Sequence, residues 1–171
     1  MSRGPTRCTM FLAALAALAI MGPSAARAER VPLMPYLSSS AFETIAQDKG
    51  VRVYKHRTSK IIRIGAEGRF PAPPERVKQA LLDYGRQIGA IDRLSEARVL
   101  SRGERSLYVY QRLNLPVIDD RDFVLHVRHG ADGGTQWVSY WAVTDRGPQP
   151  RDGIVRVTNH RGTWILEPTD S

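Results

Sequence analysis

Two histidines three residues apart, His126 and His129, are the side chains that most resemble a metal-binding or acid–base pair. They lie in and just after a run, Arg121 to Arg128, that alternates like a β-strand. Successive side chains of a strand point to opposite faces, so residues three apart do not share a face. The spacing therefore predicts structural or solvent-exposed histidines, and we expect no metal site and no cofactor.

Three aspartates nearby, Asp119, Asp120 and Asp122, are candidate oxygen ligands for calcium. A calcium loop of the EF-hand type also needs a glycine at its sixth position and a glutamate at its twelfth, and neither stands there. The sequence instead predicts a turn at Asp119 and Asp120. Arg121 and Asp122 then have a structural role, in which hydrogen bonds and ion pairs hold the start of the strand.

The chain carries none of the common catalytic motifs. It lacks the G-x-S-x-G elbow, the H-E-x-x-H zinc helix, and the glycine-rich loops that hold phosphates or dinucleotides. The single cysteine, Cys8, lies near the N-terminus, ahead of an apolar run. These observations favour a protein that is not an enzyme.

Local signals in the first half of the chain predict helices and a hairpin. A capping box, Ser40 to Glu43, with Gly50 as a stop, predicts a short helix over 41–49. Two strand-like runs follow, Val51 to Thr58 and Ile61 to Phe70. Pro74 then suits the first turn of a helix that ends near Gly85.

The second half reads as repeated β-structure with turn residues at each break. A helix, two strands, a second helix and a run of antiparallel strands form an α+β pattern and not a βαβ one. The predicted strands of this run are Ala97 to Ser101, Leu107 to Leu115, Arg121 to Arg128, Thr135 to Val143, Gly153 to Asn159 and Thr163 to Glu167.

Large aromatic side chains alternate on these strands in a way that bears on function. Tyr108 and Tyr110 point away from the aliphatic residues of their own strand, and Trp137 and Trp141 share one face of theirs. Such a sheet is bulky on both faces. It either lines a cavity with aromatic residues or fills a solid core with them.

The first 28 residues have the layout of a removable secretory signal. A basic start precedes an apolar run, Met10 to Met21, and the segment closes with Ala26-Arg27-Ala28 ahead of Glu29. The apolar run is shorter than the roughly 20 residues that span a bilayer. We therefore expect secretion across the inner membrane into the periplasm, with a linker at 29–39 and one domain at 40–171.

The exported chain is moderately basic. The signal holds three of the 25 basic residues and none of the 17 acidic ones, which leaves 22 minus 17, or +5. This excess favours anionic ligands or lipid headgroups, whereas no motif indicates nucleic acid as a partner. Several basic residues concentrate on the first hairpin, as a solvated face or as a contact with an anionic membrane surface: Arg52, Lys55, Arg57, Lys60 and Arg63.

An ordered set of segments resembles the START lipid-transfer domains of the helix-grip superfamily. The strongest is Leu115-Pro-Val-Ile-Asp-Asp-Arg-Asp-Phe-Val124, where a proline precedes an Arg-Asp-aromatic strand opening. Further matches are the late strands Gly153 to Thr158 and Gly162 to Pro168, the early hairpin at Gly50 to Tyr54, and the helix with Leu81-Leu82-Asp83. The resemblance covers roughly residues 40–171.

The resemblance implies a curved antiparallel sheet around a long C-terminal helix, with a lipid between them. This chain stops at Ser171, so the last strand and that helix are absent from the sequence, which implies a shortened product, a fragment, or completion by another chain. Arg128 matches a basic residue of the family's tunnel and is either a ligand contact or an exposed strand end. The implied ligand-binding residues are Tyr108, Tyr110, Arg128, Trp137 and Trp141.

The function that follows is non-enzymatic binding or transport of a lipid or another hydrophobic small molecule. One alternative is an enzyme like the polyketide cyclases and aromatases of the same superfamily, with His126, Arg128 and Asp122 on one strand face as acid, base and anion holder. A truncated and inactive remnant is the other alternative.

Overall fold

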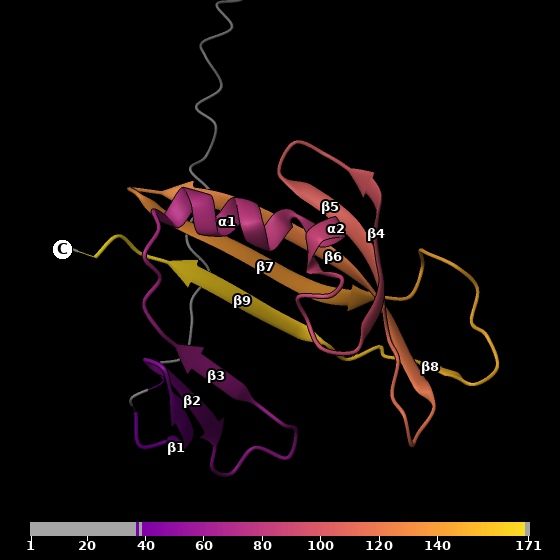
Figure 1. Ribbon diagram of the computed structural model, residues 1–171, viewed down its shortest axis with the longest axis horizontal. Coiled ribbons are helices and arrows are strands. Elements are labelled where there is room, and N and C mark those ends of the chain that lie inside the picture. Colours follow the sequence, from indigo (N-terminus) through magenta and orange to yellow (C-terminus); the bar gives the residue numbers. More distant parts are fainter. Residues whose placement is uncertain (1–36, 38, 170–171) are drawn as a thin grey trace, which may run out of the picture.

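The computed structural model describes Leu37 and residues 39–169, which form two β-sheets and two short helices (Figure 1). The signal predicted at 1–28 lies outside these residues, as does most of the predicted linker. A small antiparallel sheet comes first, with strands β1 (Phe42–Asp48), β2 (Val51–His56) and β3 (Ile64–Glu67). Helices α1 (Pro74–Leu82) and α2 (Tyr84–Gln87) follow.

The remaining strands form a six-stranded sheet in the order β4-β5-β6-β7-β9, with β8 beside β6. All neighbours are antiparallel except β8 and β6, which run parallel over three residue pairs. The predicted α+β class, an antiparallel sheet with short helices, is confirmed. The strands are β4 (Leu94–Arg102), β5 (Ser106–Leu113), β6 (Asp120–Asp132), β7 (Thr135–Val143), β8 (Ile154–Arg156) and β9 (Arg161–Leu166).

The helix predicted over 41–49 is wrong, because this segment is strand β1. Its backbone groups pair with β2 in an antiparallel ladder, and the Glu43 carboxylate bonds the Arg57 guanidinium across the sheet at 3.3 Å. Lys49 and Gly50 both have positive φ, 46° and 80°, as a tight hairpin turn requires. Gly50 is therefore the turn residue of a hairpin, and tertiary pairing overrides the local capping signal.

The helix predicted from Pro74 is confirmed, with proline in its first turn. It ends at Leu82, and α2 continues as a single turn that contains Gly85. Leu81, Leu82 and Tyr84 pack against the sheet, so this short segment is held by tertiary contacts. In Figure 1, α1 lies across β7, and α2 lies over β4.

The side of the six-stranded sheet that these helices cover is called the helix face here. It carries the core of the protein, in which Val109 and Val127 are fully buried. Alternation along each strand places these residues together on one side. The core cluster comprises Tyr84, Leu94, Ala97, Leu107, Val109, Phe123, Leu125, Val127 and Val138.

The other side of the sheet, the opposite face, is covered in part by the loop at 144–153. Gly147 in this loop packs against Val124, and the Arg146 guanidinium lies 4.3 Å from the ring centre of Tyr108. The Pro148 carbonyl accepts a hydrogen bond from Arg156 at 2.9 Å. The sheet thus buries side chains on both faces, as the aromatic alternation indicates.

Strands β3 and β9 are edge strands, and each pairs with a single neighbour among the described residues. Beyond β9 the described chain runs only to Thr169, and neither a further strand nor a long helix follows within it. Figure 1 shows the free edges of β3 and β9 on either side of the space between the two sheets. In this part of the chain no helix has both the length and the apolar character of a membrane span.

Candidate ligand-binding site

Four aromatic residues, called the aromatic cluster, lie on the helix face beside the core. Three of them, Tyr84, Tyr140 and His160, have polar tips, and the fourth is Phe123. The ring centres of Tyr140 and His160 lie 5.2 Å apart, and those of His160 and Phe123 lie 5.2 Å apart. Tyr84 projects from α2 into the same region and is only 6% exposed. Strand β7, the segment before β9, and helix α2 together position this aromatic cluster.

Burial perturbs every titratable member of the cluster. Desolvation, with a smaller contribution from Tyr140, raises the pKa of Tyr84 to about 12. Desolvation also raises the pKa of Tyr140 and lowers the pKa of His160. All three groups are therefore held in their neutral forms near pH 7, ready to donate or accept hydrogen bonds without a net charge.

The polar tips of the cluster have no hydrogen-bond partner among the residues that the structure describes. Within that part of the chain, Trp137 Nε1 is the one side-chain polar atom that is both sealed from solvent and unpaired. The hydroxyls of Tyr84 and Tyr140 and the His160 imidazole make no side-chain hydrogen bond in that part of the chain, and they are not fully sealed from solvent. They offer two hydroxyl donors and an imidazole on an apolar wall.

A pair of glutamines lies under α2 on the same face. The buried Gln111 donates from Nε2 to Oε1 of Gln87 at 3.1 Å, and Gln87 donates from Nε2 to the Leu81 carbonyl at 3.0 Å. These bonds satisfy polar groups that would be costly to bury alone. They also tie α2 to β5, which helps to set the position of Tyr84.

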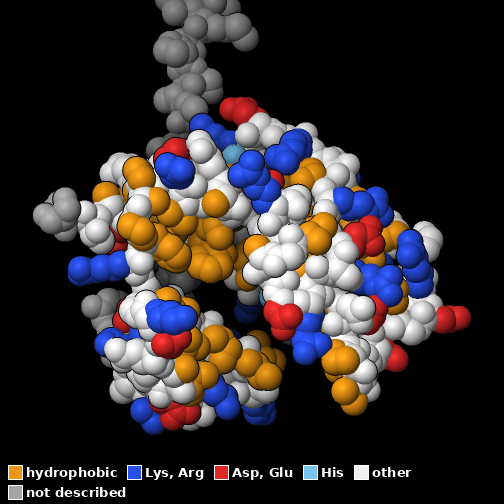
Figure 2. Space-filling view, in the orientation of Figure 1, with side chains coloured by type: hydrophobic (Ala, Val, Ile, Leu, Met, Phe, Trp, Pro, Cys, Tyr) orange, Lys and Arg blue, Asp and Glu red, His pale blue; other side chains and the backbone are white. Residues whose placement is uncertain are grey.

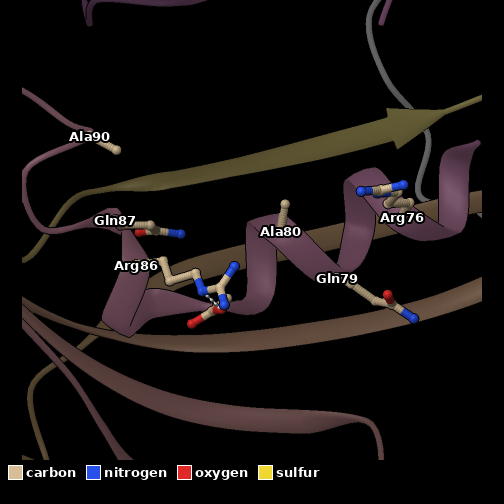
Figure 3. A pocket seen from close by; sticks show the side chains of 7 residues that line it. Arg76, Gln79, Ala80, Arg86, Gln87 and Ala90 are labelled. Carbon is tan, nitrogen blue, oxygen red and sulfur yellow. Dashed lines mark ion pairs between the residues drawn. The ribbon is translucent and has the colours of Figure 1, made fainter. Parts of the chain in front are cut away.

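An open groove of about 520 Å³ follows the outer side of the two helices (Figure 3). Gln87 lines this groove and therefore connects it to the glutamine pair. Figure 3 shows the ion pair between Arg86 and Asp83, whose atoms lie 3.3 Å apart, at its rim. The lining residues are Arg76, Gln79, Ala80, Asp83, Arg86, Gln87 and Ala90.

Part of the helix face, over β9, is exposed to solvent beside α1. Trp164 pairs with Val138 of the core in the β7–β9 register, yet its side chain is 44% exposed. Figure 2 shows hydrophobic side chains gathered over β9, beside the helices and next to a hollow. Gly162 lies directly against the Tyr140 hydroxyl, and a side chain at this position would displace that ring.

The five ligand-binding residues predicted from the sequence lie on the opposite face. Tyr108 stacks on His126 with ring centres 4.4 Å apart, and Trp141 lies 4.5 Å from His126. Tyr110 and Trp137 are buried, the latter against Gly130, and Arg128 is an exposed strand residue. Their role in binding stays a prediction that this geometry does not test, and the aromatic cluster lies on the other side of the sheet.

Asp122, to which the sequence analysis gives a structural role, is the centre of a buried network. Its carboxylate accepts two bonds from Arg156, at 2.6 and 3.0 Å, and one from the Tyr110 hydroxyl at 3.2 Å. This network raises the pKa of the Arg156 guanidinium, chiefly through the hydrogen bond to Asp122. Arg121 instead donates to the carbonyl of Asp119 at 2.6 Å.

The two histidines predicted to point apart do so. His126 stacks with Tyr108 on the opposite face, whereas the electrostatic neighbours of His129 are Lys78 and Glu75 of α1. Among the described residues, no three histidine, cysteine, aspartate or glutamate side chains form a group suited to a metal ion. Asp122 shares a face with His126, but its oxygens are bound to Arg156 and Tyr110.

The half-buried histidines predict a loss of stability on mild acidification. Burial lowers the pKa of His126, His129 and His160 below the ordinary value of 6.5, so the unfolded chain takes up protons more readily than the folded one. The free energy of unfolding should fall as the pH drops from about 6.5 through the pKa values of the folded state. Urea denaturation at pH 7.5, 6.5 and 5.5 at constant ionic strength measures this.

The carboxylate of Asp120 titrates at lower pH than the histidines, so it does not add to this effect. The Arg112 guanidinium, followed by the Leu115 backbone, holds the pKa of Asp120 below its ordinary value of 3.8, so the contribution of Asp120 is lost only at pH values below about 4. Replacing His160 with glutamine should flatten part of the dependence between pH 6.5 and 5.5. An unfolding free energy that is constant over that interval would contradict the prediction.

Sequence reasoning missed the residues of the aromatic cluster. Tyr84 and His160 lie outside the predicted strands or at their margins, and neither belongs to a motif. Arg156 was also missed as the partner of Asp122, since 34 residues separate the two in the chain. The sequence contains one pattern that points to this cluster. Val138, Tyr140 and Ala142 alternate along β7 and therefore share one face of it.

Comparisons with known proteins identify the fold. No family model matches the chain, and no curated protein matches it. A StAR-related lipid transfer protein from Xanthomonas axonopodis superposes with a TM-score of 0.69 at 24% identity, over 75% of each chain. Human STARD10 gives 0.70 at 15% identity over 78% of this chain and 57% of its own.

A third similar structure is the lipid transfer and protein localization domain of human StarD13, with a TM-score of 0.62 at 17% identity. The match covers 74% of this chain and 69% of that one. The chain therefore has a START-like fold, as the sequence resemblance implies, and it spans little more than half the length of the STARD10 chain.

Proposed function

We infer that this protein binds a lipid or another hydrophobic small molecule on the helix face and carries it without chemical change. The observation that carries the proposal is the aromatic cluster, where Tyr84, Tyr140 and His160 present unpaired polar tips on an apolar wall. Such a surface suits an amphipathic molecule, whose apolar body packs on the sheet while a polar group accepts hydrogen bonds. The exposed Trp164 extends the apolar wall beyond α1.

The similar structures support this proposal. The Xanthomonas protein is described as a lipid transfer protein, and the StarD13 domain as a lipid transfer and protein localization domain. These proteins share the fold of this chain, although identity is low and fold alone does not carry function. The ligand class proposed here therefore depends on the chemistry of the cluster and agrees with these neighbours.

The proposal includes export to the periplasm and contact with anionic membranes. Export is inferred from the layout of the first 28 residues, and membrane contact from the net charge of +5 that remains after them. A carrier of hydrophobic molecules must load and unload at a membrane, and a positive surface brings it to anionic headgroups. The proposed function involves no nucleic acid.

Mass spectrometry of the protein purified from the periplasmic fraction tests the proposal. We expect an N-terminus at Glu29 and an extractable lipid or other hydrophobic compound in stoichiometric amount. A circular-dichroism spectrum of the same sample establishes that it is folded. Folded protein without any bound compound would overturn the binding proposal, and material that is unfolded when purified would favour the inactive remnant.

The enzyme alternative receives no support from the geometry of its residues. The carboxylate of Asp122 is bonded to Arg156 and Tyr110, and His126 is packed between aromatic rings. Arg128 lies two residues further along the same strand face and is exposed. An acid–base set needs a free carboxylate or imidazole near a substrate, so no second function is proposed.

A further inference from the structure

The loop between β2 and β3, residues 57–63, exposes two large aliphatic side chains. Ile61 is 45% exposed and Ile62 is 84% exposed, and both follow Lys60 and precede Arg63. Exposed isoleucines side by side cost free energy in water, so a surface that keeps them is a candidate for an interaction. The order cation, isoleucine, isoleucine, cation makes the loop amphipathic over a very short stretch.

The adjoining face of the three-stranded sheet has the same character. Ile64 is 54% exposed and pairs with Lys55 across the β2–β3 register, which places both on one face. The alternate residues Phe42 and Tyr54 are buried on the other face. Figure 2 shows hydrophobic and basic side chains together over this small sheet.

The charge of the segment is strongly one-sided. Residues 42–70 hold seven lysines and arginines and three acidic residues, which gives 7 minus 3, or +4. Ion pairs join Arg52 to Glu67 and Arg57 to Glu43, each at 3.3 Å. Three further basic residues lie nearest the exposed isoleucines: Lys55, Lys60 and Arg63. None of them forms an ion pair with another residue that the structure describes.

We propose that the loop at 57–63 docks this protein on an anionic lipid bilayer, with Ile61 and Ile62 inserted among the lipid chains. Lys55, Lys60 and Arg63 lie at the level of the headgroups, where each basic residue adds attraction to anionic lipid. The inference rests on the proposed function in one respect, since it names the docking surface of a carrier that works at membranes. It requires no bound ligand.

Charge is the reason that a membrane is chosen over a second copy of the chain. A dimer through this loop would bring Lys60 and Arg63 against their own copies, and like charges in contact oppose association. The loop between β5 and β6 offers the contrast, since Val117 is 90% exposed and Ile118 is 58% exposed, but Asp119 and Asp120 follow them. That loop is equally apolar and lacks the cations.

Site-specific fluorescence tests the proposal on the exported chain from Glu29 onward, which has no cysteine of its own. Either Ile62→Cys or Val117→Cys is introduced and labelled with an environment-sensitive dye. With vesicles of phosphatidylglycerol and phosphatidylcholine, the dye at position 62 should shift to the blue and brighten, and the dye at position 117 should not. Membrane attachment by any other segment leaves the dye at position 62 in water, which would overturn the proposal.

A double variant, a second vesicle composition and a protein concentration series complete the test. Lys60→Gln with Arg63→Gln should weaken vesicle binding, as followed by the dye at position 62, by roughly fivefold for each charge removed. Pure phosphatidylcholine vesicles should give little response. Equal blue shifts at positions 62 and 117, or a shift that grows with protein concentration without vesicles, would overturn the proposal in favour of unspecific insertion or self-association. The search for bound lipid by mass spectrometry tests only the proposed binding on the helix face. Its result is therefore independent of this test of the docking loop.

Discussion

Replacing Asp122 with alanine is expected to lower the free energy of unfolding by about 3–5 kcal/mol. Asp122 is 2% exposed, and its carboxylate receives two bonds from Arg156 and one from the Tyr110 hydroxyl. Without it, the Arg156 guanidinium is left nearly buried without its counter-charge, and that uncompensated charge accounts for most of the loss. Urea denaturation of the variant and the parent at pH 7.5 measures the difference.

A matched control separates this effect from the general loss of an aspartate. Asp119 lies three residues earlier and is exposed, and replacing it with alanine should change stability by no more than about 0.5 kcal/mol. A double variant, Asp122→Leu with Arg156→Met, should recover part of the loss because it removes both charges. A loss below about 1 kcal/mol for Asp122→Ala would show that the network is not structural.

Replacing Tyr84 and Tyr140 together with phenylalanine is expected to weaken binding of a dansyl-labelled fatty acid roughly 10- to 100-fold. Both hydroxyls lie on the helix face, are not fully sealed from solvent and lack partners among the described residues, so the fold loses no hydrogen bond on their removal. A bound carboxylate, however, loses two donors. Dansyl fluorescence, which brightens when the probe leaves water, reports binding in variants that keep all three tryptophans.

The control for this prediction also decides between the two faces of the sheet. Tyr108 lies on the opposite face, in a stack with His126, and Tyr108→Phe should leave the affinity within about twofold. Unfolding curves of all variants confirm that stability is retained. Weaker binding in Tyr108→Phe, together with unchanged binding in the double variant, would place the ligand on the face predicted from the sequence.

The elements with a strong periodic pattern could be predicted from the sequence. Strand β7 has the predicted bounds, and α1 begins at the predicted Pro74, because both combine clear alternation or helical spacing with turn residues at their ends. Strand β1 could not be predicted, since Ser40 and Glu43 form a valid local capping pattern. Pairing with β2 supplies backbone bonds that a helix of this length cannot match.

The candidate site was harder to predict than the fold, for a physical reason. Alternation shows that Tyr108 and Tyr110 share one side of a strand and that Val138 and Tyr140 share one side of another. It does not show which side a helix covers, because that depends on Leu81, Leu82 and Tyr84 docking from a distant part of the chain. The alternation of the aromatic residues could be found from the sequence, but the face that the helices cover, and with it Tyr84 and His160, could not.

The three-stranded sheet has a consequence for the order in which the molecule opens. Phe42 and Tyr54 are the large side chains buried within β1–β3, and the main contacts of these strands are with one another. A unit with so little apolar surface buried has a low free energy of local opening, so its amides exchange with solvent while the six-stranded sheet stays folded. The segment that carries Ile61 and Ile62 can therefore reorient as a separate foldon, and the aromatic cluster need not melt for it to do so.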